Sequence, residues 1–459
     1  MNRLNLKSKN SKLDFIIYIL LGVLFLFDYF ISTFKTRNYV TSFLFFLIGF
    51  ITYIEFVRDK RMFSINKFIM IYLFVFEYIA PYKQYLSNYN VWGLTEFTEE
   101  DFLYSSLVVL IFLLSYLFAN RVLFKKIKNI KIKVGYNKPN KINAFSLYVL
   151  SFISFLCLLY LLSTRQLINL GNGIDSSVGS NTIKIFLIVF IRFIPVASLL
   201  YYFCFFKDVR TSLPRISVRI IYILITVVVV LLIYFPLNGT IPRYFLFSVY
   251  LMVAFLVMRK TKNRSFILLG ILFGFVFIFP AFNFFKYHSI KDISNFTLGG
   301  LNFNFYDYDA HQLLMLTIKY CEANGYSYGM NILTGLLSFI PRSIWKSKMM
   351  PSGMLIAESF NASFTNLSCP IYAEFYLSFG LIGAVLLTFT LTYFIKLCEL
   401  KMLRGSLINE LINIVIIGLS MYIMRGAFLP AMAYTYGMIL AIIFVQVIIN
   451  ICNSFKKRY

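Results

Sequence analysis

The residues best able to do chemistry are gathered in one polar stretch, residues 283–371. It contains both histidines of the 459-residue chain, His288 and His311. His311 follows two acidic residues at alternating positions, in Asp307-Tyr-Asp309-Ala-His311. Carboxylates and an imidazole at this spacing suit either a general base or a divalent metal site. The competing interpretation is that Asp307 or Asp309 caps a helix formed by the apolar residues that follow.

Basic residues surround a tryptophan further along the same stretch. Arg342, Lys346 and Lys348 lie within seven residues, on both sides of Trp345. Arginine presents a planar fork of donors to phosphate oxygens, lysine adds a point charge, and tryptophan favours the headgroup depth of a bilayer. The segment is therefore predicted to bind either a lipid diphosphate or the anionic headgroups of ordinary lipids.

The elements that must position these residues are apolar helices. The chain is 59% hydrophobic and only 14% charged, which indicates an all-α polytopic membrane protein rather than a soluble domain. Runs of about 20 apolar residues predict twelve spans, near 14–32, 39–57, 68–82, 102–120, 143–163, 183–206, 219–237, 242–258, 265–282, 372–395, 408–424 and 430–452. Nine spans thus lie in residues 1–282 and three in residues 372–459, with the large loop 283–371 between them.

The basic residues orient these spans. The segments that would lie on one side of the membrane hold 30 of the 44 Lys and Arg residues. Because Lys and Arg accumulate in cytoplasmic loops, both termini are predicted to be cytoplasmic. The loop 283–371 would then lie outside a bacterial inner membrane. The net charge of +25 is mainly a topology signal on this interpretation, and a nucleic-acid partner is not expected.

Two segments of the large loop have helical patterns. In residues 329–340 the apolar side chains recur at helical spacing, which predicts a helix lying along the outer leaflet. Residues 310–320 predict either a second such helix or one packed on the spans. The loop also carries Cys321 and Cys369, which form either a disulfide or two ordinary small apolar residues.

Several arginines lie at or within spans, where charge is costly and usually functional. They are predicted to form a cationic pocket beneath the loop, unless some of them pair with carboxylates such as Glu77 or Glu374. These arginines are Arg165 and Arg425 at outer span ends, Arg192 within the sixth span and Arg243 at the outer start of the eighth.

Layout and motifs together resemble a known family. The layout of the chain, with about twelve spans and a long external loop before the last three, is similar to that of the O-antigen (Wzy-type) oligosaccharide repeat-unit polymerases. Locally, Pro341-Arg342-Ser-Ile-Trp345 resembles the family's Pro-Arg-x-x-Trp segment, and Arg425-Gly426 resembles its C-terminal Arg-Gly. Lys346 and Met349 stand where the family has prolines.

The resemblance implies a glycosyltransferase. Such an enzyme transfers a growing glycan from undecaprenyl diphosphate to a new lipid-linked repeat unit at the outer face of the membrane, for O-antigen, capsule or exopolysaccharide synthesis. Preorganised cations would neutralise the departing diphosphate, and this role is assigned to Arg342, Arg243, Arg192, Arg425 and Arg165, with Lys346, Lys348 and Trp345 assisting. The candidates for a general base are His311, Asp309 and Glu374.

The same interpretation sets expectations for cofactors and partners. The reaction requires no metal or other cofactor, because arginines can neutralise the leaving group. The partners would be undecaprenyl-diphosphate-linked oligosaccharides and membrane lipid, together with a chain-length regulator and a flippase. Three other functions compete: a metal-dependent polyprenyl-phosphate glycosyltransferase, an O-antigen ligase, and a non-enzymatic lipid-linked oligosaccharide flippase. The length of the external loop counts against the flippase.

Overall fold

The computed structural model describes residues 11–33, 36–59, 64–127, 142–164, 182–205, 215–235, 241, 243–258, 270, 303–404 and 407–455. Over these ranges the chain is helical and contains no strand. In chain order the elements are α1 (Ser11–Thr33), α2 (Tyr39–Arg58), α3 (Ile65–Phe74), the π-helix η1 (Val75–Ile79), α4 (Ala80–Ser87), α5 (Glu99–Ile127), α6 (Ala144–Ser163), α7 (Thr182–Phe205), α8 (Ile216–Ile233), α9 (Arg243–Met258), the 3-10 turn η5 (Tyr306–Tyr308), α12 (Ala310–Asn324), α13 (Met330–Leu336), α14 (Ser352–Ser359), α15 (Ile371–Arg404), α16 (Leu407–Arg425) and α17 (Phe428–Phe455).

The helices are those of a polytopic membrane protein. Nine helices of the described part are long and apolar enough to cross a bilayer. In α8 the mean hydropathy reaches 2.9 and only 28% of the apolar window is buried. Ile216, Leu224 and Leu231 of this helix are all more than half exposed. A helix that exposes so much apolar surface is stable in lipid and unfavourable in water.

The spans predicted from hydropathy agree with the helices. Every predicted span coincides with a helix except the one near 265–282, of which the structure describes residue 270 alone. The predicted span near 68–82 is the composite α3–η1–α4, which runs without a break from Ile65 to Ser87. Local capping fixes several starts: Asn38 accepts a hydrogen bond from the Val40 N–H at the start of α2, and Ser64 accepts one from the Lys67 N–H at the start of α3.

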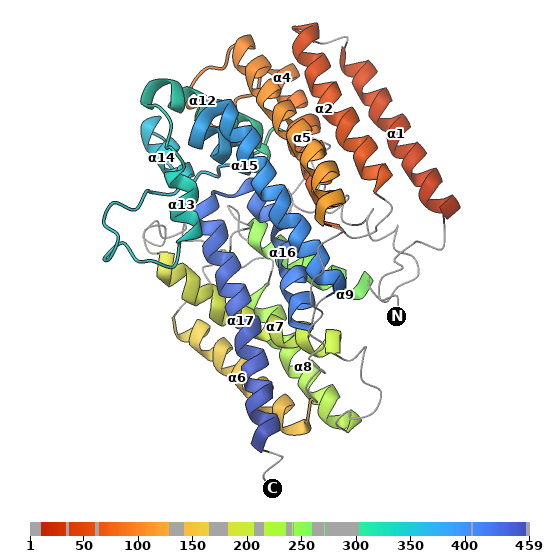
Figure 1. Cartoon of the computed structure of the whole chain (residues 1–459), viewed down its shortest axis with the longest axis vertical. Coiled ribbons are helices and arrows are strands. Elements are labelled where there is room, and N and C mark those ends of the chain that lie inside the picture. Colours follow the sequence, from red (N-terminus) through yellow and green to blue (C-terminus); the bar gives the residue numbers. More distant parts are fainter. Residues whose placement is uncertain are drawn as a thin grey trace, which may run out of the picture.

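Residues 303–370, the described part of the chain that precedes α15, pack onto the spans (Figure 1). Figure 1 shows α12, α13 and α14 gathered beside the beginning of α15, at the end of the molecule opposite the C-terminus. α12 contacts η1, α5, α14 and α15, and its residues from Ala310 to Ile318 are buried. Residues 310–320 therefore form a helix that packs on the spans, whereas its depth relative to the membrane surface stays a prediction.

α13 has the polarity expected of a helix against lipid. Asn331 and Thr334 are buried, whereas Leu333 and Leu336 are 43% and 44% exposed. Polar side chains thus face the protein and apolar ones face outward, the reverse of a helix in water.

The long helix α15 is interrupted soon after its start. Phe379 and Gly380 leave the helical conformation, and Gly380 has φ +62°. A Cβ at position 380 would also lie 2.8 Å from the Tyr326 hydroxyl. Glycine is therefore required here for conformation and for space, and the kink separates the short first part of α15 from its long apolar part.

Candidate functional site: an aspartate–arginine pair beneath an aromatic shelf

Arg425 and Asp309 form a buried ion pair between the end of α16 and the start of α12. The Arg425 Nη2 contacts Asp309 Oδ1. Arg425 also donates from Nε to the Asp307 carbonyl at 3.1 Å and from Nη2 to the Tyr306 carbonyl at 3.0 Å. The 3-10 turn η5 therefore holds the guanidinium through its backbone. As the last residue of α16, Arg425 also places its charge at the favourable end of the helix dipole.

Three aromatic side chains lie over this pair, and we call them the aromatic shelf: Trp92, Tyr306 and Phe364. The ring centroids of Trp92 and Tyr306 are 4.7 Å apart, and those of Trp92 and Phe364 are 6.1 Å apart and nearly parallel. Tyr306 is 48% exposed, and the other two rings are half-buried. The Trp92 Nε1 donates to Asp309 Oδ2 at 3.0 Å. The shelf is thus joined to the ion pair by a direct hydrogen bond.

Burial makes Asp309 more basic than an ordinary aspartate. Its side chain is 1% exposed, and this desolvation raises its pKa above 3.8, while the nearby Arg425 charge and the Trp92 hydrogen bond act in the opposite direction. Arg425 therefore keeps the proton affinity of Asp309 lower than burial alone would make it. Any movement of the guanidinium away from Asp309 would raise the pKa further.

Two segments distant in sequence meet to form the site. The Gln84 side chain donates to the Phe303 carbonyl at 2.9 Å and to the Tyr308 carbonyl at 3.0 Å. The Val91 N–H donates to Gln312 Oε1 at 2.8 Å. These bonds dock residues 84–92 against residues 303–312 and bring Trp92 over Asp309.

Glu374, in the first turn of α15, ties four elements together. One carboxylate oxygen accepts from the Phe428 N–H at 2.7 Å, at the N-terminus of α17. The other accepts from Asn331 of α13 and from Ser352 of α14, each at 2.7 Å. A carboxylate is favourable at a helix N-terminus because of the unpaired N–H groups and the helix dipole. Glu374 is fully buried and is placed to hold structure rather than to meet a substrate.

His311 belongs to a separate buried cluster. Its Nδ1 lies 2.7 Å from Glu77 Oε2 in the π-helix η1, and its Nε2 lies 2.8 Å from Ser105 Oγ of α5. The Tyr372 hydroxyl of α15 donates to the other Glu77 oxygen. All four side chains are fully buried. Both ring nitrogens are thus engaged in the protein, so this geometry favours a positioning role for His311 over contact with a substrate.

The basic segment around Trp345 is folded on itself. Lys348 is 2% exposed, and its Nζ donates to the carbonyls of Leu337, Ser338 and Ile340 at 3.5, 3.0 and 2.8 Å. An ammonium has three N–H donors, and here they cover the carbonyls that follow α13. Burial, and then the nearby Arg342 charge, lower the Lys348 pKa.

Arg342 completes this folded segment. It donates to the Lys348 carbonyl at 2.8 Å and to the Met349 carbonyl at 3.1 Å. Lys346 is exposed, and the half-buried Trp345 donates from Nε1 to Ser347 Oγ at 3.1 Å. Of the predicted phosphate ligands in this segment, Lys346 is the one that projects outward.

The predicted arginine pocket is described only in part. Arg192 of α7 is 3% exposed and interacts electrostatically with Tyr434. Tyr434 packs against Tyr422 with ring centroids 5.1 Å apart, and Tyr422 interacts with Arg425. Arg192 and Arg425 therefore each interact with one member of the same tyrosine pair.

The remaining predictions concern residues that the structure does not describe, and two cysteines. Arg165 and His288 fall outside the described residues, and so does the Arg243 side chain at the start of α9. Cys321 and Cys369 are free thiols, so the disulfide alternative is wrong for this structure.

Sequence reasoning missed the shelf. Trp92, Tyr306 and Phe364 come from three separate segments, and no local pattern links them. One signal was present: Trp92 is one of only two tryptophans in the chain, and it lies in a polar connection.

Comparison of the chain with protein-family models, with curated proteins and with solved structures finds no match.

Proposed function

We propose that this membrane protein is a glycosyltransferase that uses a polyprenyl-diphosphate-linked donor. In the proposed reaction, a growing glycan leaves undecaprenyl diphosphate and is joined to a lipid-linked oligosaccharide repeat unit, at the outer face of a bacterial inner membrane with both termini in the cytoplasm. The product would be O-antigen, capsule or exopolysaccharide. The observation that carries the proposal is the Arg425–Asp309 pair beneath the aromatic shelf.

The shelf supplies a surface for sugar rings. A pyranose ring presents apolar C–H groups on its faces, and these pack well on aromatic rings, whereas the hydroxyl groups at its edge need polar partners. Trp92 and Tyr306 offer such faces. The partly exposed Tyr306 marks the side from which a glycan would approach.

The ion pair supplies both a cation and a base. The acceptor hydroxyl must lose a proton as it attacks the anomeric carbon, and the leaving diphosphate gains negative charge. In our proposal the diphosphate competes with Asp309 for Arg425. The arginine then neutralises the leaving group, and Asp309, with its pKa raised by burial, accepts the hydroxyl proton.

This mechanism changes the order of the base candidates. Asp309 comes before His311 and Glu374, because its partner Arg425 is a cation that a diphosphate can attract and Trp92 joins it to the partly exposed shelf, whereas the other two bond to groups enclosed in buried clusters. It also disfavours a metal at the Asp-x-Asp motif, since the Arg425 guanidinium already occupies the carboxylate of Asp309.

The test uses the surface polysaccharide of cells that lack the gene. A polymerase deletion leaves surface lipid with one repeat unit and no ladder, whereas bare core without any unit would favour a ligase or a flippase. Trp92→Ala and Tyr306→Ala should fail to restore the ladder although the protein reaches the membrane.

Phe305→Ala is the matched control for this test. Phe305 is adjacent to Tyr306 and 42% exposed, and it lies outside the shelf. It should restore the ladder fully. A normal ladder from both shelf variants would overturn the proposed glycan site.

A further inference from the structure

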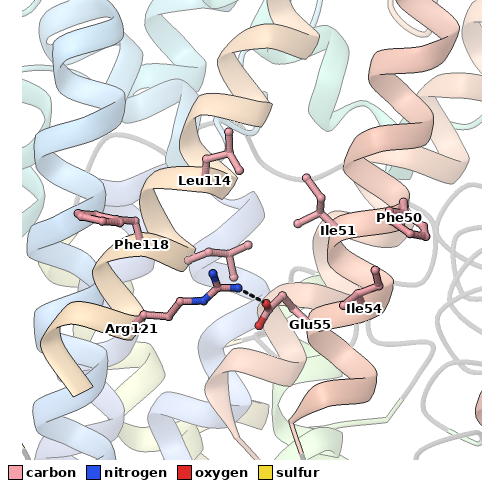
Figure 2. Close-up of a pocket in the computed structure, with 8 residues that line it drawn as sticks. Phe50, Ile51, Ile54, Glu55, Leu114, Phe118 and Arg121 are labelled. Carbon is pink, nitrogen blue, oxygen red and sulfur yellow. Dashed lines mark hydrogen bonds and ion pairs between the residues drawn. The ribbon is translucent and has the colours of Figure 1, made fainter. Parts of the chain in front are cut away.

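A groove of about 490 Å³ lies between α2 and α5 (Figure 2). Ile51 and Leu117 line it, and Leu117 is only 6% exposed. Its rims are apolar side chains with exposures of 40 to 61%, namely Phe50, Ile54, Leu114 and Phe118. Side chains of this kind form a surface that water would wet poorly and a hydrocarbon chain would fill well.

One end of the groove is charged. Figure 2 shows Arg121 of α5 reaching across to Glu55 of α2. The Arg121 Nη2 lies 2.7 Å from Glu55 Oε1, and the Arg58 Nη1 lies 3.4 Å from the same oxygen. Two arginines thus share one carboxylate, which leaves one positive charge in excess. The arginine side chains are 60% and 67% exposed, so both can also meet a ligand.

The charged end lies at headgroup depth. α5 enters the apolar layer after Glu99, Glu100 and Asp101, and Arg121 follows Asp101 by 20 residues. At 1.5 Å per residue this is about 30 Å, which matches the roughly 30 Å hydrocarbon thickness of a bilayer. Arg121 therefore lies at the membrane surface opposite to Glu99. The basic-residue distribution predicts that this surface is cytoplasmic.

The length of the groove fits part of one leaflet. From Leu114 to Arg121 the helix rises about 10 Å, and a leaflet contributes roughly 15 Å of hydrocarbon. The groove is therefore long enough for the upper part of one acyl chain, with its headgroup at the arginines. A polyprenyl diphosphate donor presents its diphosphate at the opposite surface, near the Asp309–Arg425 pair, and so does not match this end.

We propose that the groove binds an anionic glycerophospholipid. One acyl chain lies between α2 and α5, and the phosphate bonds to Arg121 and Arg58. Arginine suits this role because its fork of donors matches phosphate oxygens. The site is independent of the proposed transferase reaction and stands if that proposal fails.

The experiment measures lipid retained by the purified full-length protein. The protein is extracted in a mild detergent and incubated with phosphatidylglycerol, phosphatidylcholine or undecaprenyl phosphate, and bound lipid is counted by native mass spectrometry. Phosphatidylglycerol should be retained in preference to phosphatidylcholine. Since each basic residue near a membrane surface contributes about a fivefold effect, Arg58→Gln with Arg121→Gln should weaken retention by roughly 10- to 25-fold.

Two further variants make the result decisive. Arg215→Gln removes another exposed arginine, which lies before α8 on the same predicted side, and should leave retention unchanged. Leu114→Trp fills the groove from its rim without changing charge, and should reduce retention even if the double arginine variant folds poorly. Equal retention of the two phospholipids, unaltered retention in both groove variants, or a preference for undecaprenyl phosphate would each overturn the proposal.

Discussion

Removal of Arg425 is expected to destabilise the protein strongly. In Arg425→Met the Asp309 carboxylate, 1% exposed, would lose its cation. The carbonyls of Asp307 and Tyr306 would lose their donor as well. Breaking a buried ion pair by removing one partner costs about 3–5 kcal/mol, because the remaining charge is desolvated without compensation. The midpoint of thermal unfolding should fall by several degrees.

A double variant separates the charge effect from the packing effect. Replacing both members of a buried pair by apolar residues is often neutral or stabilising, so adding Asp309→Leu to Arg425→Met should recover part of the lost stability. Recovery stays incomplete, because the Trp92 Nε1 and the two η5 carbonyls still lack partners, and each unsatisfied group costs about 1–3 kcal/mol.

The assay is thermal unfolding of the purified protein in detergent, followed by the ladder assay in cells. The matched control is Lys83→Met, which breaks the 2.6 Å ion pair with Asp28, whose members are 31% and 42% exposed. Exposed pairs contribute about 0–1 kcal/mol, so this variant should unfold close to the wild-type temperature and make a full ladder.

Two outcomes would refute the reasoning about Arg425. If the double variant loses as much stability as the sum of the single variants, the two charges are not coupled. If the double variant is folded and still makes a normal ladder, the Arg425–Asp309 pair serves structure alone, and the proposed chemistry is wrong.

Other variants test the remaining clusters. Lys348→Met should expose the end of α13 to proteolysis, because three carbonyls lose their donor, whereas Lys346→Met, at an exposed position, should not. Glu374→Gln should lower the free energy of unfolding by about 1–3 kcal/mol, since an amide N–H₂ replaces an oxygen that accepts from Asn331. Unchanged thermal unfolding of this variant would contradict the role of the Glu374 carboxylate as an anchor. Because the pKa of Asp309 is raised above 3.8, its protonation stabilises the folded state at low pH, and this contribution is lost as pH rises through the folded pKa. Asp309→Asn should abolish that pH dependence, and a wild-type pH profile in this variant would show that Asp309 does not cause it.

The helices were predictable because the bilayer imposes a length. Roughly 20 apolar residues are needed to span it. The sequences of α2, α8 and α17 each contain such a run, so these helices can be predicted from local composition alone. The kink of α15 was not predicted, because hydropathy does not encode the positive φ of Gly380 or the nearby Tyr326 hydroxyl, which leaves little space for a side chain there.

The individual residues of the site could be selected from the sequence, but their arrangement in space could not. Asp309 and Arg425 could each be selected as polar groups near apolar runs, yet their pairing depends on how α12 packs on the spans. The pattern of residues 310–320, which include His311 and Gln312, left open an interfacial α12. In the structure both are buried and bonded to Ser105 and Tyr89.

Similarly, the basic segment around Trp345 was assigned to phosphate. Charge alone cannot distinguish a cation that awaits a ligand from one that caps carbonyls of its own segment. For Lys348 the difference follows from three backbone contacts at the end of α13. That information exists only in the fold.

Comparison of three of the buried carboxylates, Glu77, Asp309 and Glu374, identifies the one best suited to change partners. Glu374 is held by neutral donors, including the backbone of α17, and Glu77 is enclosed with His311. Neither cluster can release its carboxylate without leaving buried groups unsatisfied. Asp309 differs because its main partner, Arg425, is a cation that a diphosphate could attract, while Trp92 would still donate to the carboxylate. A substrate that recruits Arg425 would thereby increase the basicity of Asp309 at the moment a base is needed. The ion pair would remain closed in the absence of substrate, which protects both charges from the apolar surroundings.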